Sequence, residues 1–204
     1  MARSLASSLR TLRKDQRGVS IIEFGLAMPV LAVLIVMGLD LTNLVIANHR
    51  IRAIAAMTAD NASRLRTQMS EEFIKQLFVG VEKAGEPINF KTQGRVILSS
   101  IQNNEQKKAS KKGQWIRWQR CFGDITVNSA VGPEGFGKND NDLPNASGLT
   151  AQAGSAIMFA EVSYDYKPLF PNGLIKAQRI EHAVAYIVRQ RTDFGISGSS
   201  PATC

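Results

Sequence analysis

The side chains that most often carry catalysis or bind metals are sparse in this chain. It has two histidines, His49 and His182, and two cysteines, Cys121 and Cys204. Neither histidine has a second histidine or a cysteine at the spacing of a metal site. The sequence also lacks a nucleophile elbow and a glycine-rich phosphate loop. We therefore predict no catalytic residue, no metal and no cofactor, and a protein that is not an enzyme.

The two cysteines could instead pair with each other. Both follow the apolar segment described below, so export of the C-terminal part would bring them into an oxidising compartment. A bridge from Cys121 to Cys204 would tie the last residue to the body of the chain. The loop-entropy model gives it about 4 kcal/mol as an upper figure. Two unrelated thiols are the alternative, and we predict the bridge.

A different chemistry is indicated by one carboxylate near the start of an apolar segment. In the stretch DQRGVSIIEFGLAMPVLAVLIVMGLDL, residues 15–41, Glu23 stands five positions after Gly18 and directly before sixteen uncharged residues. A carboxylate at the centre of a bilayer costs about 2.5–3.5 kcal/mol on insertion scales, and less near an interface. Such a residue needs a partner, for example an ammonium group, or it must reach the lipid headgroups.

The segment around Glu23 has the length of a membrane-spanning helix. Val19 to Leu39 is 21 residues, or about 31 Å as a helix, which matches the hydrocarbon core of a bilayer. A cleavable secretory signal would have a shorter apolar core and a small-x-small site after it. We therefore predict a span that stays with the protein. Pro29 would bend this span at the carbonyl of Gly25, although an ordinary membrane-helix proline is an equal alternative.

Charge gives the orientation of the span. Residues 1–18 hold five Lys/Arg and one acid, which is half of the formal net charge of +8. A basic arm before an apolar run indicates a cytoplasmic N-terminus and places residues 47–204 across the membrane. Nucleic-acid binding is the competing interpretation of such an arm, but no aromatic residue is interleaved with its charges. Membrane lipid is therefore the predicted contact, and nucleic acid is not.

The remainder of the chain predicts an α+β domain. The helix is expected to continue to residue 66 with one apolar stripe, and Ser70 is expected to cap a second helix over 71–85. Strands are predicted at 95–101, 114–122, 158–167 and 182–191, as a meander-like antiparallel sheet packed against helices. Residues 128–154, rich in Gly, Asn and Asp, are predicted to be an exposed loop. Of Trp115 and Trp118, one is expected in the core and one at the surface.

Together, the N-terminal features resemble the type IV prepilin processing motif. That motif joins a basic leader, a glycine at the cut, four mostly apolar residues, a glutamate and a long apolar helix, and here the cut falls between Gly18 and Val19. Phe24 after Glu23 is similar to the Tad/Flp branch. The strand ending in WQRC, the YDYKPLF element, the VRQR strand and the terminal cysteine extend the resemblance, over the whole mature chain, to the TadE-like minor pilins, or pseudopilins.

This resemblance implies a division of the chain and a set of partners. A prepilin peptidase would remove leader 1–18, leaving a transmembrane pilin-like helix at 19–46, a stalk extension at 47–66 and an extracytoplasmic α+β domain at 67–204. Glu23 would balance the α-amino group of a neighbouring subunit, and Phe24 and Pro29 would serve packing of the helix. The implied partners are other minor pilins, the major Flp pilin and the inner-membrane Tad assembly platform.

The role that follows is assembly of a bacterial adhesion fibre. We expect a single-pass inner-membrane protein, with its C-terminal domain in the periplasm, that initiates or caps a Tad (tight adherence) pilus and can enter the surface pilus. The alternative is an uncleaved, signal-anchored exported domain that binds a ligand or acts as an enzyme. A helix that only anchors has no reason to place Gly18 and Glu23 at this spacing.

Overall fold

The computed structural model describes residues 18–140, 143, 148, 150–170, 173, 175–199 and 203–204. The predicted leader therefore lies outside the described residues, apart from Gly18. The described residues form two compact units. The helix unit contains those up to Asn43 and those of segment 168–176, and the sheet unit contains Leu44–Lys167 and Ala177–Cys204.

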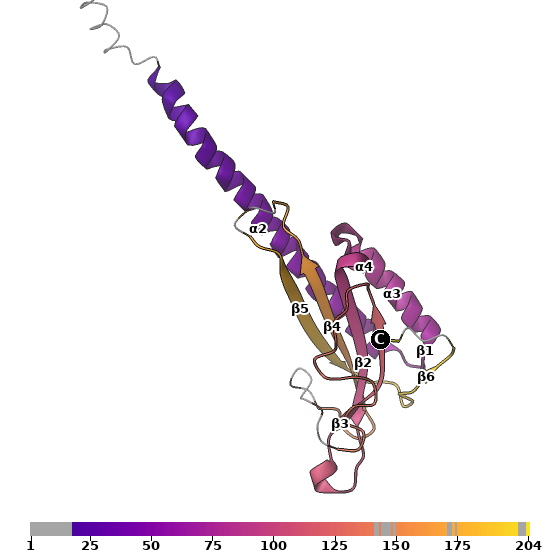
Figure 1. Ribbon diagram of the computed structural model, residues 1–204. Coiled ribbons are helices and arrows are strands. Elements are labelled where there is room, and N and C mark those ends of the chain that lie inside the picture. Colours follow the sequence, from indigo (N-terminus) through magenta and orange to yellow (C-terminus); the bar gives the residue numbers. More distant parts are fainter. Residues whose placement is uncertain are drawn as a thin grey trace, which may run out of the picture. The chain divides into compact units, whose positions relative to one another are not determined.

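One long helix, α2 (Val19–Arg64), begins in the helix unit and ends in the sheet unit (Figure 1). The prediction of a single continuous helix from residue 19 is confirmed. The helix ends at Arg64 and not at residue 66, because the chain then enters the short strand β1 (Met69–Ser70). Within the sheet unit, α2 buries a stripe of mostly small apolar side chains: Ala47, Ile51, Ile54, Ala55, Thr58, Ala59 and Ala62.

The second predicted helix is present with the predicted bounds. Helix α3 (Glu71–Gly85) starts after Ser70, whose hydroxyl accepts a hydrogen bond from the backbone N–H of Phe73 at 3.2 Å. This is the expected N-cap, which satisfies one of the free donors of the first turn. Two short turns, η1 (Glu86–Ile88) and α4 (Phe90–Gln93), lead from α3 into the sheet.

The sheet has four antiparallel strands: β2 (Gly94–Asn103), β3 (Gln114–Phe122), β4 (Ala156–Tyr166) and β5 (Gln178–Ile187). The α+β prediction is thus confirmed, with β2 and β3 joined by a connection that contains η2 (Ala109–Lys111). The spatial order is β3-β2-β4-β5, so β4 adds beside β2 and the sheet is not a simple meander (Figure 1). A two-stranded parallel pair joins β1 to β6 (Ile196–Ser197).

Strand β5 lies four positions earlier than the predicted segment 182–191. Its register on β4 runs from Gln178 opposite Tyr166 to Ile187 opposite Ile157. After Ile187, one more backbone bond forms, from the N–H of Val188 to the carbonyl of Ala156, the first residue of β4. Because β4 then offers no further partners, the apolar and basic residues that follow cannot extend the ladder.

Both faces of the sheet are covered. On one face Val162 and Tyr164 lie under the helices, where Phe78 of α3 stacks on Phe122 with ring centroids 5.7 Å apart. The other face carries a second apolar cluster, in which loop residues cover sheet residues: Val131, Leu143 and Ala151 over Ile101, Ile116, Ile157 and Phe159. The prediction that 128–154 is simply an exposed loop is therefore wrong for these three residues, because the second sheet face is apolar and must be shielded.

The tryptophans and the cysteines follow the predictions. Trp118 is buried and donates its indole N–H to the carbonyl of Phe194 at 3.1 Å, whereas Trp115 is only half-buried. Cys121 of β3 and Cys204 form a disulfide across 83 positions of sequence. This bond fixes the last residue to the edge strand of the sheet.

Candidate functional site

The residues predicted to be processed lie at the point where α2 begins. Gly18 is in a turn, Val19 is the first helical residue, and the N–H of Ile22 donates to the Gly18 carbonyl at 3.2 Å. Both Gly18 and Val19 are exposed, and no described neighbour lies within 4 Å of where a Cβ on Gly18 would be. A protease that cuts this bond would meet no steric obstacle from the described residues and would leave all of α2 in the product.

Glu23 lies one helical turn further along. Val19 and Glu23 are four residues apart, so they share one face of the helix about 6 Å apart along its axis. Glu23 and Phe24 are exposed. Within the described residues, no hydrogen bond or ion pair reaches the Glu23 carboxylate. A partner for this charge must therefore come from headgroups, from the leader or from another molecule.

The helix that presents these residues is long and apolar enough to cross a membrane, by length and composition. None of the residues in its most apolar 18-residue window is buried within the described part of the chain. A core helix of a soluble domain would bury such a window. The apolar surface of residues 19–39 is therefore available to lipid or to other helices.

Pro29 lies inside α2, and the helix continues through it. Because proline has no N–H, the Gly25 carbonyl receives no bond from residue 29. Gly25 is exposed, with no described atom near the position of a Cβ. The structure thus leaves room for another chain to approach at this carbonyl, and the role of Pro29 in assembly stays a prediction.

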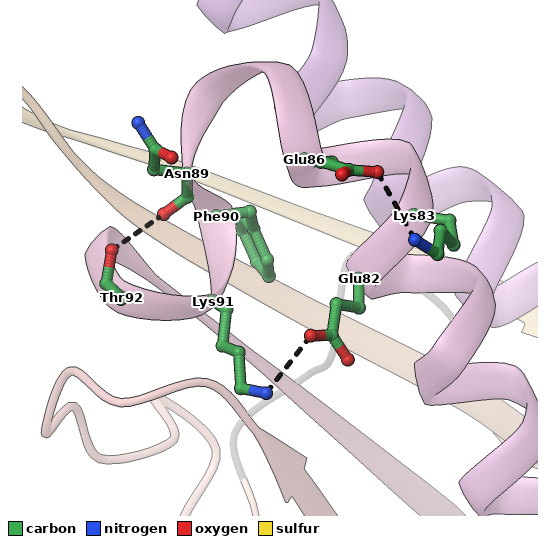
Figure 2. A pocket seen from close by; sticks show the side chains of 7 residues that line it. All are labelled: Glu82, Lys83, Glu86, Asn89, Phe90, Lys91 and Thr92. Carbon is green, nitrogen blue, oxygen red and sulfur yellow. Dashed lines mark hydrogen bonds and ion pairs between the residues drawn. The ribbon is translucent and has the colours of Figure 1, made fainter.

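The described part of the sheet unit contains several surface pockets. One, of about 170 Å³, lies where α3 passes into α4 (Figure 2). Figure 2 shows each of its lysines directed at a carboxylate: Lys91 is 3.0 Å from Glu82, and Lys83 is 3.4 Å from Glu86. The two lysines and the two carboxylates of this pocket are thus paired with each other.

A carboxyl group with altered acidity lies on the loop-covered face of the sheet. Glu161 of β4 accepts hydrogen bonds from the Ser129 hydroxyl and from the N–H of Ala130, the latter at 2.8 Å. Burial raises the pKa of Glu161 above its ordinary value, the two hydrogen bonds partly oppose this, and the charge of Glu181 adds to it. A raised carboxyl pKa can mark an acid–base site, but here the carboxyl ties the 129–130 loop to the sheet.

His182, which has no partner at metal-site spacing in the sequence, lies against α2 in the structure. Its Nε2 lies 2.8 Å from Asn48 Oδ1 and 3.2 Å from Arg52 Nε. Burial, and then the charge of Arg52, lower the pKa of His182. His49 is exposed. Among the described residues no three His, Cys, Asp or Glu side chains gather at a possible metal site.

Sequence reasoning also missed a buried ion-pair cluster. The single Nε–H of Arg120 in β3 is shared between the two carboxylate oxygens of Glu71, at 2.9 and 3.1 Å, and Nη2 donates to the same carboxylate at 2.5 Å. Its Nη1 lies 2.9 Å from Glu134 of the loop. Burial disfavours the charged guanidinium, but the carboxylates of Glu71 and Glu134 outweigh it and raise the pKa of Arg120. The cluster joins the start of α3, the edge strand and the loop, which is a structural task.

Comparisons with family models, with curated proteins and with solved structures find no match to this chain. The assignment of function must therefore rest on the residues and geometry described above.

Proposed function

We propose that this chain is a TadE-like minor pilin that is cut between Gly18 and Val19 and co-assembles through α2 to initiate or cap a Tad pilus. The observation that carries the proposal is the relative position of the proposed cut, the start of α2 and the Glu23 carboxylate. The helix begins at the residue after the proposed cut, and a carboxylate stands one turn later on an otherwise apolar, exposed helix. Each feature serves assembly, and a simple anchor requires none of them.

The proposed cut would create a charge that Glu23 can neutralise. Cleavage frees an α-amino group on Val19, which is an ammonium below a pKa of about 7.7–8.0. In hydrocarbon, an isolated carboxylate and an isolated ammonium are each costly, and a close pair removes much of that cost. Glu23 has no partner among the described residues of its own chain, which favours an ammonium on a neighbouring subunit as the partner.

The proposal includes a location and the absence of enzymatic activity. The basic arm would remain in the cytoplasm until it is removed, α2 would span the inner membrane once, and the sheet unit would lie in the periplasm. The disulfide between Cys121 and Cys204 is consistent with that oxidising compartment. The partners would be a prepilin peptidase, other minor pilins, the major Flp pilin and the Tad assembly platform.

The first test is the N-terminal sequence and intact mass of the protein from membranes, with and without the prepilin peptidase. We expect a terminus at Val19 that depends on the peptidase. Gly18→Leu should block the cut, whereas Gly25→Leu, at an equally open glycine of the same segment, should be processed normally. A wild-type chain that keeps residues 1–18 in the presence of the peptidase would refute processing and favour the signal-anchored alternative.

The second test concerns the carboxylate. Glu23→Ala and Glu23→Gln should insert into the membrane at wild-type levels, since each removes a charge from the span. Both should be depleted from the sheared pilus fraction and should reduce piliation, because the ammonium of the neighbour loses its counter-charge. Normal piliation with Glu23→Gln would refute the proposal that the Glu23 carboxylate neutralises the ammonium of a neighbouring subunit, whatever the result of the cleavage test.

A further inference from the structure

The connection between β4 and β5 folds onto α2 where its uncharged stretch ends. Asp40 is the first charged residue after that stretch and is only 2% exposed. The N–H of Leu169 donates to Asp40 Oδ1 at 2.9 Å. Gly173 closes a turn by donating its N–H to the Phe170 carbonyl at 2.9 Å. We call the described residues of 168–176 the juxtamembrane turn.

The approach of this turn to the carboxylate is close. A Cβ on Gly173 would lie 3.1 Å from Asp40 Oδ2 and 3.0 Å from the Phe170 carbonyl, tighter than most packed Cβ contacts. An aspartate in a helix at the edge of an apolar span is costly unless it is hydrogen-bonded. The backbone N–H of Leu169 gives it such a bond, so the carboxylate and the turn stabilise each other.

The outer surface of the turn is apolar. Leu169 is 58% exposed and Phe170 is 38% exposed. On α2 beside Asp40, Leu39 and Leu41 are exposed as well. The exposed Lys176 ends the turn. A turn that has exposed apolar side chains and ends in a lysine suits a membrane interface, where apolar side chains enter the acyl region and an ammonium meets lipid phosphates.

The length of the span sets the depth of the turn. If Val19 to Leu39 fills the hydrocarbon, as the proposed function requires, Asp40 lies at its extracytoplasmic boundary. We infer that the juxtamembrane turn is a lipid-binding element: Leu169 and Phe170 insert into the outer interface of the bilayer, and Asp40 holds the turn at that depth. Lipid is favoured because the turn, with exposed Leu169 and Phe170, is bonded to Asp40 directly after the exposed apolar stretch of the spanning helix. This inference rests on the membrane placement of α2 and adds a second contact with the membrane.

The chain is well suited to a labelling test, because both of its cysteines are in the disulfide. Phe170→Cys in the full chain would carry an NBD fluorophore in phosphatidylcholine–phosphatidylglycerol vesicles. Lipids brominated along the acyl chain quench a fluorophore that enters the membrane. Phe136→Cys is the matched control, since Phe136 is 37% exposed and lies in the sheet unit. Val30→Cys, within the span, reports insertion of α2.

We expect quenching at positions 170 and 30 and none at 136. Bromines near the headgroup end should quench position 170 best, and deeper bromines should quench position 30 best. Adding Asp40→Ala should lower quenching at 170 towards the level at 136 and leave position 30 unchanged.

The outcomes separate this inference from the proposed function. Quenching at 30 without quenching at 170 would overturn the lipid-binding turn and leave the membrane helix intact. No quenching at 30 would overturn both the span and the turn. Quenching at 170 that Asp40→Ala does not alter would refute the part assigned to the aspartate. Disulfide-linked dimers of the unlabelled Phe170→Cys chain under an added oxidant, together with no quenching of the labelled chain at 170, would show that a second copy covers the turn and that lipid does not.

Discussion

The buried cluster around Arg120 permits a sharp test of how the sheet unit is held together. Glu71 and Glu134 both pair with the same guanidinium, but the Glu71 side chain is 4% exposed and the Glu134 side chain is 51% exposed. Removing the partner of a buried charge costs about 3–5 kcal/mol, because the remaining ion is left without compensation. An exposed partner contributes about 1 kcal/mol or less, because water screens the pair.

Glu71→Ala should therefore destabilise the sheet unit far more than Glu134→Ala, although each removes one carboxylate from Arg120. Glu71 also stands in the first turn of α3, where a negative charge adds about 0.3–1 kcal/mol. The two contributions together are about 3.3–6 kcal/mol. At about 2–4 °C per kcal/mol for a unit of this size, we expect the Tm to fall by roughly 7–24 °C for Glu71→Ala and by a few degrees for Glu134→Ala.

The assay is thermal unfolding of the full chain in detergent, followed by near-ultraviolet circular dichroism of the buried Trp118. The double variant Glu71→Leu with Arg120→Met should recover much of the loss, since a well-packed apolar pair can replace a buried ion pair. Equal losses for Glu71→Ala and Glu134→Ala would refute the argument, because burial would then not decide the strength of these pairs.

Three further predictions concern the sheet unit. Cys121→Ser with Cys204→Ser should lower the free energy of unfolding by up to about 4.5 kcal/mol, from a loop of 83 positions, and reductant should lower the Tm of the wild type but not of this variant. Glu161 has a raised pKa, so its stabilising contribution is present below its ordinary pKa of 4.5 and is lost as pH rises through the folded value. Urea titrations from pH 4 to pH 8 should accordingly show Glu161→Gln gaining stability relative to the wild type as pH rises, and a constant difference would contradict this. In the same titrations, Gly123→Ala should destabilise the protein much more than Gly135→Ala. Both glycines have positive φ, but of the two only Gly123 would place a Cβ against a backbone oxygen, at 2.2 Å. Equal losses of stability would show that the strain of positive φ alone decides the cost.

The elements that the sequence predicted well are those with strong local signals. Helix α3 has an N-cap serine, acidic residues in its first turn and a glycine at its end, and its bounds were predicted correctly. Strand β3 was also placed correctly, because a turn-rich segment precedes it and a glycine follows it. The start of α2 followed from Gly18, which precedes a mostly apolar segment of membrane-spanning length.

The errors come from partners that are distant in sequence. The bounds of β5 depend on where β4 begins, and the burial of Val131 depends on an apolar second face of the sheet. One local signal for an apolar second face was available in strand β4. Phe159 lies on the same side of the strand as the polar residues Glu161, Ser163 and Asp165, and it packs in the loop-covered cluster. Arg120 with Glu71, and His182 with Asn48, are joined across 49 and 134 positions respectively, and no local pattern connects such pairs.

The pattern within α2 explains why processing and folding need not interfere. Apart from Ser20 and Glu23, the helix is apolar up to Leu39 and none of these residues is buried, whereas within the sheet unit the helix buries a single stripe. The first pattern needs lipid or other helices, and the second needs only the chain's own sheet. The proposed cut and the Glu23 carboxylate both belong to the helix unit, and the core residues named above belong to the sheet unit. Variants at Gly18 and Glu23 can therefore test assembly without disturbing that core, and variants at Glu71 and Arg120 can test the core without altering the segment that would be processed.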